Sequence, residues 1–393
     1  MKAYIVQNKN KIEPLLEEIG EILIKNKRLN VLQKEIIADL GLRPVMVRDF
    51  SEINDDDEHI VFNDGLFFEP ELLREFIKES KRLNKTTVCA LKKGIFTLRT
   101  LTCVQGVKEQ NDYIEYNLYY YPQKQLRNEK LEPIIFEPDE NLESISLPKH
   151  MENSGKYLIP ITTNSIIQIN HWSNIWSANL TSVLSNLARF KKSSKLKFIF
   201  RILKNLSLNK WKLVGSMNKI GKNCDIHPTA YIEGSEIGDN VIVGAGTIIR
   251  ESAIGDNSFL GNGVVVEFSV VGKNCTILNG HILYSVLYPG VFTVTHMIST
   301  SIIGSDSFIG SGVVLTDFRF DGKNITVIKE GQKIDSGNLF LGCCLGNNVY
   351  LGGGCIVAPG RIIPSNLHIS LEKEKTISNI LDKKQINGFR IIS

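Results

Sequence analysis

An aliphatic residue followed by a small or polar residue returns every six positions, with occasional steps of five, through most of the second half of this 393-residue chain. An amphipathic helix needs apolar residues three and four positions apart, so the period excludes one. It fits a coil of short strands and tight turns, in which three hexads form one triangular turn and successive turns stack as parallel strands about 4.8 Å apart. The aliphatic positions fall in the ranges 220–283, 303–315 and 339–363.

The turns between the strands are visible in two stretches, "IGDNVIVGAGTII" at 237–249 and "IGDNSFLGNGVVV" at 254–266. The aliphatic side chain points inward, and the Gly, Asn or Asp that follows takes the corner, where a positive φ is cheap. This pattern resembles the hexapeptide-repeat proteins, which form a left-handed parallel β-helix. Most proteins of that class are trimeric acyltransferases with active sites in clefts between neighbouring prisms. The resemblance implies acyl transfer by a homotrimer; the alternative is a spacer that only oligomerises.

Two segments depart from the period, 284–301 and 316–338. Insertions in a solenoid project as loops from one face, and binding or catalytic groups are commonly built there. We therefore expect both segments to leave the middle of the prism as loops.

The motifs around these segments resemble the bifunctional sugar-1-phosphate nucleotidyltransferase/acetyltransferases, which include the bacterial enzyme that makes UDP-N-acetylglucosamine and its archaeal relatives. The chain has "TH" at 295–296, "SIIGSDSFIGSGVV" at 301–314 and "TDFRFDGKN" at 316–324, in the family's order and nearly at its spacing. The His lies one residue closer to its hexad than the family leads us to expect. The resemblance implies that His296 is the general base of acetyl transfer, a role that suits imidazole because it titrates near neutral pH.

Further site residues follow from the same resemblance. Arg319 and Lys323 would hold a substrate phosphate, with solvated loop charges as the alternative interpretation. Asp317, which stands where the family usually has Asn, would orient the base or a sugar hydroxyl, and His281 is a second candidate for the base. The last coil resembles the part of these prisms that binds coenzyme A, so acetyl-CoA is the expected acyl donor and a sugar phosphate or nucleotide sugar the expected acceptor. The expected lining of the CoA site is Ala358, Gly360 and Arg361.

Short apolar strands alternate with helical stretches over residues 1–185, which predicts an α/β domain with a largely parallel sheet. The architecture resembles the same family, whose N-terminal domain is a nucleotidyltransferase. "HIVFNDGLFF" resembles its strand that ends in a metal-binding Asp, here Asp64, and Asn179 stands at the usual Asn of the segment that closes that domain. The expected strands are 3–7, 43–49, 59–64 and 86–91, and the expected helices are 12–26 and 70–84.

The phosphate-binding loop that a nucleotidyltransferase needs is missing. Backbone N–H groups of a Gly-rich loop must approach the triphosphate, but after "AYIVQ" the chain has no Gly before Gly20. We therefore expect a degenerate domain in which Asp64 and Asn179 remain as candidate ligands for Mg²⁺. Two alternatives stay open for the whole protein: a working sugar-1-phosphate nucleotidyltransferase, and a non-catalytic scaffold that binds a nucleotide sugar.

The net charge of +4 is small for this length and is concentrated at 189–212, so we expect no nucleic-acid partner. As a helix this basic segment is amphipathic; packing between the domains is the preferred interpretation, and contact with an anionic membrane surface is the alternative. The seven scattered cysteines form no CxxC pair and suit reduced thiols, which favours the cytoplasm.

Together these patterns predict four segments along the chain. They are a degenerate nucleotidyltransferase-like α/β domain at 1–185, a basic helical linker at 186–219, a left-handed β-helix acyltransferase-like domain at 220–370, and a tail at 371–393.

Overall fold

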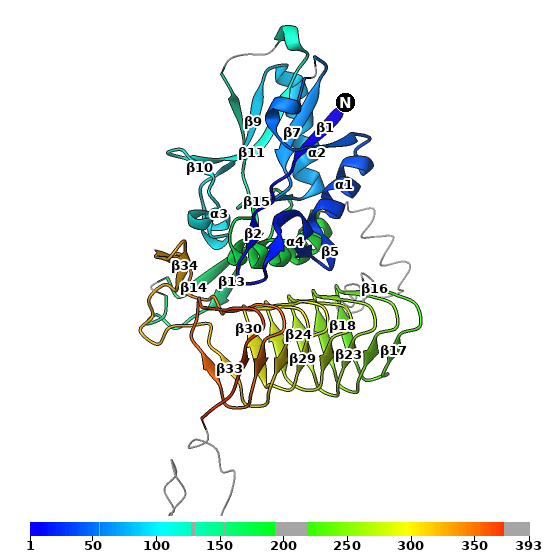
Figure 1. The fold of residues 1–393 in the computed structure, drawn as a ribbon, viewed down its shortest axis with the longest axis vertical. Helices are drawn as coiled ribbons and strands as arrows, with labels where there is room; N and C mark the ends of the chain where they lie inside the picture. The colour runs from blue at the N-terminus through cyan, green and yellow to red at the C-terminus, as the bar shows by residue number, and fades with distance from the viewer. Residues whose placement is uncertain (55, 127–129, 153, 193–217, 373–393) are drawn as a thin grey trace, which may run out of the picture.

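The computed structural model describes residues 1–54, 56–126, 130–152, 154–192 and 218–372. An N-terminal domain, called the head here, sits along one side of a long prism (Figure 1). Most of the predicted linker and tail, at 193–217 and 373–393, lie outside the described residues, and so does most of the basic segment with its expected membrane contact. No helix within the described part of the chain is long and apolar enough to cross a membrane.

The prism has three faces, each made of short parallel strands stacked one per coil. Face 1 contains β16 (Lys219–Ile220), β19 (Glu236–Ile237), β22 (Ala253–Ile254), β25 (Val270–Val271), β28 (Val286–Leu287), β31 (Ile302–Ile303), β36 (Cys344–Leu345) and β39 (Ile362–Ile363). Face 2 contains β17 (Asp225–Ile226), β20 (Ile242–Val243), β23 (Phe259–Leu260), β26 (Thr276–Ile277), β29 (Phe292–Thr293), β32 (Phe308–Ile309), β37 (Tyr350–Leu351) and β40 (His368–Ile369). Face 3 contains β18 (Tyr231–Glu233), β21 (Ile248–Arg250), β24 (Val265–Glu267), β27 (His281–Leu283) and β30 (Met297–Ser299), followed by the pair β33 (Val314–Leu315) and β38 (Ile356–Val357).

The stacked parallel strands fit the left-handed β-helix that hexapeptide repeats predict. Along each strand one side chain points inward, and these inward residues form a continuous aliphatic core through the prism. Its fully buried members include Ile249, Leu260, Val266, Val271, Ile277, Ile282, Ile298, Ile303, Ile309 and Leu345.

The expected loop at 284–301 is wrong, because this segment continues the coil as β28, β29 and β30. Two features hide the period in the sequence. Ala253 pairs with Val270, 17 residues on, whereas Val270 pairs with Val286, only 16 residues on. Thr293 also takes an inward position, fully buried, where the pattern leads us to expect an aliphatic residue.

The head combines a mixed sheet with four α-helices. The sheet order is β12 (Glu132–Phe136), β9 (Thr87–Lys92), β11 (Tyr113–Tyr121), β7 (His59–Asn63), β1 (Lys2–Val6) and β6 (Arg43–Val47), with β10 (Lys108–Glu109) on β11. The neighbours of β11 pair with it antiparallel, and the other pairs along this order are parallel. The helices are α1 (Leu29–Asp39), α2 (Pro70–Leu83), α3 (Ile95–Arg99) and α4 (Trp172–Lys192).

Most elements expected in the head are present. The four expected strands correspond to β1, β6, β7 and β9, and α2 starts at Pro70 as predicted. Smaller two-stranded sheets complete the domain: β2 (Lys11–Ile12) with β3 (Glu17–Glu18), β4 (Leu23–Ile24) with β5 (Lys27–Arg28), β8 (Leu66–Phe68) with β15 (Ile166–Gln168), and β13 (Leu142–Ser146) with β14 (Lys156–Pro160). Helix α4 continues through the predicted boundary at 185/186.

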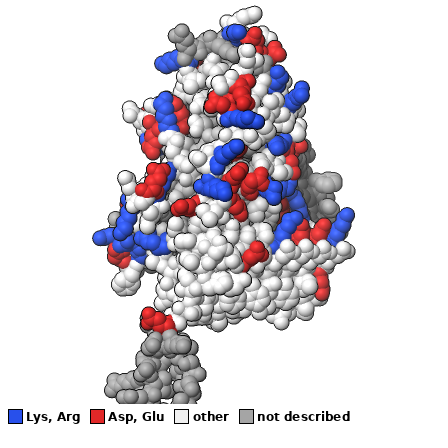
Figure 2. Space-filling view, viewed as in Figure 1, with Lys and Arg blue, Asp and Glu red and all other residues white. Residues whose placement is uncertain are grey.

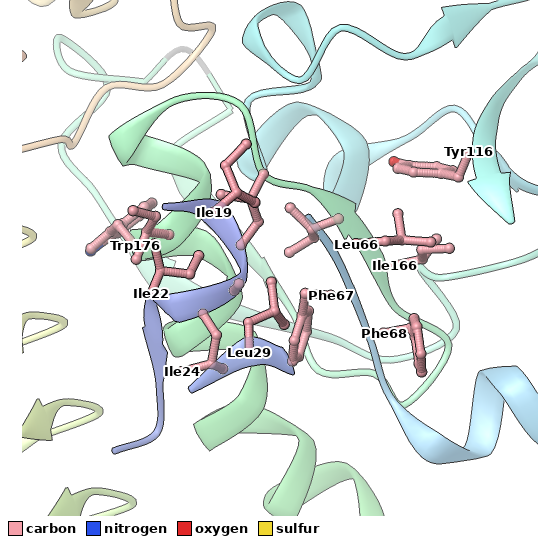
Figure 3. Close-up of a cluster of buried hydrophobic side chains, with 14 of the residues drawn as sticks. Ile19, Ile22, Ile24, Leu29, Leu66, Phe67, Phe68, Tyr116, Ile166 and Trp176 are labelled. Carbon is pink, nitrogen blue, oxygen red and sulfur yellow. The ribbon is translucent and has the colours of Figure 1, made fainter. Parts of the chain in front are cut away.

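The expected helix at 12–26 is wrong, and this segment instead folds as short strands with a 3₁₀ turn at Ile19–Glu21. Leu16, Lys25 and Asn26 have positive φ, which a helix does not allow. The apolar residues at helical spacing are still buried, because Ile19, Ile22 and Ile24 pack beside Trp176 and other core side chains (Figure 3).

The head and the prism share one hydrophobic core. The outward side chains of face 1, which would meet water on an isolated prism, belong to the same buried cluster as the core of the head. Polar contacts also cross the junction: Trp176 Nε1 donates to the Tyr284 carbonyl at 2.7 Å, and Asn26 Nδ2 to the Val271 carbonyl at 2.9 Å. The face-1 residues in this cluster are Ala253, Val270, Val286, Ile302 and Cys344. The head therefore covers face 1, while the outward side chains of faces 2 and 3 lie outside this shared cluster.

Candidate active site

His296 lies at the corner that joins face 2 to face 3, between β29 and β30, and its side chain is exposed. Its Nδ1 is 3.4 Å from Nδ2 of Asn279, which occupies the same corner one coil earlier. Gly280 allows the two coils to stack closely here, because its φ is +108° and a Cβ would lie 2.2 Å from the Thr295 carbonyl oxygen. The corner thus presents an imidazole at an open edge of the prism.

A row of charged side chains lies at the ends of the face-3 strands that point away from this corner. Arg250 lies between two carboxylates, with Nη1 3.0 Å from Oε1 of Glu267 and Nε 3.5 Å from Oε2 of Glu233. The second Glu267 oxygen is 3.0 Å from Nε2 of His281. His281 is therefore the better oriented of the two imidazoles, since a carboxylate fixes its ring, and His296 is the more exposed.

Sequence analysis missed Glu267 as a partner of His281. The signal was present, because Glu233, Arg250 and Glu267 pair with one another along face 3 at successive 17-residue steps. Alternating charges at the period of a whole coil predict a stacked ion-pair row. His281 joins the row diagonally, since its direct pairing partner is Val265.

The second departure from the period does leave the prism, as expected, and it contacts the head. Strands β34 (Thr326–Lys329) and β35 (Gln332–Asp335) form an antiparallel hairpin. Lys329 Nζ donates to the Val104 carbonyl at 3.0 Å, and His171 Nε2 lies 3.2 Å from the Ile328 carbonyl oxygen. Part of this insertion therefore fastens the head to the prism.

The three predicted substrate-binding residues lie in the first part of the insertion. Arg319 forms an ion pair with Asp321, with Nε 2.8 Å from Oδ1, and this hydrogen bond lowers the pKa of Asp321 to about 2. The Lys323 backbone N–H donates to the same carboxylate at 3.3 Å. Asp317 instead lines a cavity between the head and the prism. A phosphate would have to compete with Asp321 for Arg319.

The three predicted CoA-binding residues of the last coil differ in their surroundings. Ala358 is exposed, whereas Gly360 is buried against the hairpin, with its missing Cβ 2.4 Å from the Thr326 carbonyl oxygen. Arg361 Nη1 donates to that same carbonyl at 2.8 Å. Gly360 and Arg361 thus position the hairpin, and Ala358 is the one with an open surface.

The two predicted metal ligands of the head have separate partners. Asp64 is buried, accepts the Asn8 backbone N–H at 2.9 Å, and has a pKa raised to about 6 by burial. Asn179 accepts from the Lys25 N–H at 2.7 Å and donates to the Leu23 carbonyl at 2.9 Å, which ties the β4–β5 hairpin to α4. Within the described residues no three His, Cys, Asp or Glu side chains form a group that holds a metal ion. These contacts do not fit a Mg²⁺ site, which needs several oxygen ligands.

The repeat is also recognised by comparison with known proteins. Residues 218–251 and 253–285 match the family model described as the hexapeptide repeat of succinyl-transferase. The prism is built from hexapeptide repeats. The matched hexapeptide repeats form the first coils of the prism and end before His296. The match therefore concerns the prism, and the roles of the site residues stay predictions. No curated protein matches the chain.

Three solved structures are similar to part of this chain at low identity. They are the acetyltransferase domain of PglB from Neisseria gonorrhoeae FA1090 in complex with acetyl coenzyme A (17% identity, 38% of this chain and 51% of that one, TM-score 0.14), a hexapeptide transferase family protein from Anaplasma phagocytophilum (17%, 39% and 80%, TM-score 0.20), and UDP-N-acetylglucosamine acyltransferase from Campylobacter jejuni (14%, 44% and 77%, TM-score 0.23). The chain spans about half the length of the Neisseria structure that it matches. These TM-scores are too low to relate whole folds.

Proposed function

We propose that this protein transfers an acetyl or similar acyl group from coenzyme A to a sugar phosphate or nucleotide sugar, with His296 as the general base. The observation that carries the proposal is an exposed imidazole at the border of face 2 on a hexapeptide-repeat prism. The repeat model that the prism matches is named for an acyl-transferring protein. The head covers face 1, and His296 lies at the corner between the other two faces.

The chemistry needs a base at this position. An amine or hydroxyl of the acceptor attacks the thioester carbonyl carbon, a C–N or C–O bond forms, and the C–S bond breaks. His296 takes the proton that the attacking group loses, and the departing thiolate of coenzyme A takes one up. The developing oxyanion needs a hydrogen-bond donor, such as a backbone N–H group at a turn.

Face 2 supports a homotrimer as the active assembly. Its outward side chains form an aromatic row in which Phe292 stacks on Phe308 with ring centroids 5.7 Å apart, and Tyr350 stacks on His368 at 4.2 Å. Phe292 and Tyr350 are 37% and 41% exposed, which is unusual for aromatic residues in a continuous row. Few charged side chains lie over the lower part of the prism (Figure 2). With face 2 against a neighbouring copy, His296 would lie at the rim of the cleft between subunits.

Replacing one aromatic residue of this row with Glu should break the assembly. We expect Phe308→Glu to convert the trimer to monomers, because each interface loses about 1.5–3 kcal/mol of apolar burial and must bury a charge. Ile356→Glu is the matched control, since Ile356 points outward from face 3 and is 73% exposed. Sedimentation velocity distinguishes the states, and a Phe308→Glu trimer would exclude face 2 as the interface.

Calorimetric titration with acetyl-CoA tests the donor half of the proposal before any acceptor is known. We expect saturable binding in the micromolar range. Thiol release with a panel of sugar phosphates and nucleotide sugars then identifies the acceptor. Absence of binding at millimolar donor would remove coenzyme A from the proposed function.

A further inference from the structure

A cavity of about 320 Å³ lies between the head and the prism. Helix α3, the β13–β14 pair and α4 supply its head side, and residues at the ends of β27 and β30 supply its prism side. The lining is mainly apolar, and includes Phe96, Trp176, Leu180, Leu283, Met297 and Phe340. Cavities of this size and composition are typical of small-molecule sites at domain junctions.

One buried polar group on the cavity wall lacks a partner. Thr300 is 5% exposed, and its Oγ1 has no hydrogen bond within the described part of the protein. Buried hydroxyls nearly always have a partner, but this oxygen is itself shielded from a water-sized probe, so the cavity as it stands offers a ligand an apolar wall here. The Arg99 guanidinium is already engaged, since it donates to Asn338 Oδ1 at 3.1 Å and lies 3.9 Å from the centroid of the Tyr157 ring.

The charge of the lining limits the class of ligand. Asp317 contributes a carboxylate, while the one cation in the lining, Arg99, has the protein partners just described. An anionic head group inside the cavity would therefore be unfavourable. A neutral hydrocarbon chain fits the apolar wall.

The cavity begins next to the proposed catalytic corner. Met297, which lines it, follows His296 in the chain and pairs with His281 on the neighbouring strand. Leu283 and Ser299, which also line it, are a pair on the same two strands. The apolar lining thus continues from the pair β27–β30, whose first residues are His281 and Met297, beside the corner of His296.

We propose that this cavity binds the hydrocarbon chain of the acyl donor, so that the protein transfers a medium-chain acyl group in preference to acetyl. A water-sized group occupies about 30 Å³, so the volume accepts on the order of ten heavy atoms. The assignment of the bound chain to the acyl donor rests on the proposed acyl transfer. The bond that breaks is still the C–S bond of the thioester, and the proton of the attacking group still passes to His296. The existence of the chain-binding site is testable without it.

Calorimetry with octan-1-ol, a neutral chain with one hydroxyl, tests the cavity itself. We expect saturable binding to the full chain, weakened at least tenfold by Met297→Trp, which fills the cavity entrance. Val314→Trp is the matched control, because Val314 also points outward from face 3 and is 47% exposed, against 46% for Met297, but does not line the cavity. Absent binding, or binding that Met297→Trp leaves unchanged, would overturn the proposal.

A second titration decides whether the chain belongs to the donor. Octanoyl-CoA should bind the wild type at least tenfold more tightly than acetyl-CoA, and Met297→Trp should remove that advantage while leaving acetyl-CoA affinity unchanged. Equal affinities for the two thioesters would overturn the inference and leave the proposed acetyl transfer standing. If neither thioester binds while octan-1-ol does, the proposed function and the assignment to an acyl donor both fail.

Discussion

Alanine at His296 should lower the rate of acyl transfer by about 10²–10⁴-fold, the range expected when a general base is removed. The measurement is thiol release from the CoA thioester with the identified acceptor. Donor affinity by calorimetry should change little, because the imidazole acts on the acceptor's proton. A rate loss with unchanged donor binding would separate a catalytic role from a structural one.

His227→Ala is a matched control for this prediction. His227 occupies the same kind of corner, between β17 and β18 in the first coil, is exposed, and has its Nδ1 2.8 Å from Thr229 Oγ1. Its removal should leave the rate unchanged. His281→Ala tests the alternative base: we expect less than a tenfold loss, and a loss larger than that of His296→Ala would assign the proton transfer to the His281–Glu267 pair.

Methionine at Arg189 should destabilise the head strongly. Arg189, near the end of α4, donates two hydrogen bonds to Glu71, at 2.7 and 2.9 Å, and also contacts Glu69, whose side chain is 7% exposed. Burial raises the pKa of Glu69. Breaking a buried pair costs about 3–5 kcal/mol, and because a third of the Arg189 side chain is exposed we expect about 2–3 kcal/mol. Thermal unfolding followed by circular dichroism should show Tm lowered by about 4–12 °C.

A second substitution identifies the cause of that loss. Glu69→Gln in the Arg189→Met background removes the uncompensated buried charge and should recover at least half of the lost stability. Lower pH should act in the same direction, because a group whose pKa is raised in the folded state stabilises at low pH and loses that contribution as pH rises. If the double variant is no more stable than Arg189→Met, lost packing of the arginine stem explains the effect.

The fold class of the prism was predictable because the sequence pattern that produces it is local. Each coil needs an inward aliphatic residue and a corner that tolerates positive φ, and both are visible in the sequence. The prediction failed at 284–301, where Thr293 is buried with its hydroxyl group and the coil is one residue shorter. The prediction of a helix at 12–26 also failed. The apolar residues of this segment are buried against α4 and the prism without forming a helix. Such tertiary packing cannot be read from the spacing of apolar residues alone.

The surroundings of the site were less predictable, because they depend on residues far apart in the chain. His296 was expected in a projecting loop, but it lies at a corner of the prism because its segment continues the coil. The partner of Arg319 was only two residues away, at Asp321, but charge alone does not distinguish an internal ion pair from a phosphate site. The contact of Arg361 with Thr326 joins the last coil to the inserted hairpin, and the cavity between Thr300 and α4 exists only because the head is seated on the prism.

Contacts between the first and the last parts of the chain also determine when folding can be completed during synthesis. Asn347 donates to the carbonyl of Leu15, and Ser365 to that of Pro14, across more than 300 residues of chain. At about 5–20 residues per second, a ribosome takes roughly 17–66 s to make the 332 residues between Leu15 and Asn347. During that time the first hairpins lack their final cover. We therefore expect the nascent chain to lack these contacts until its last coils emerge.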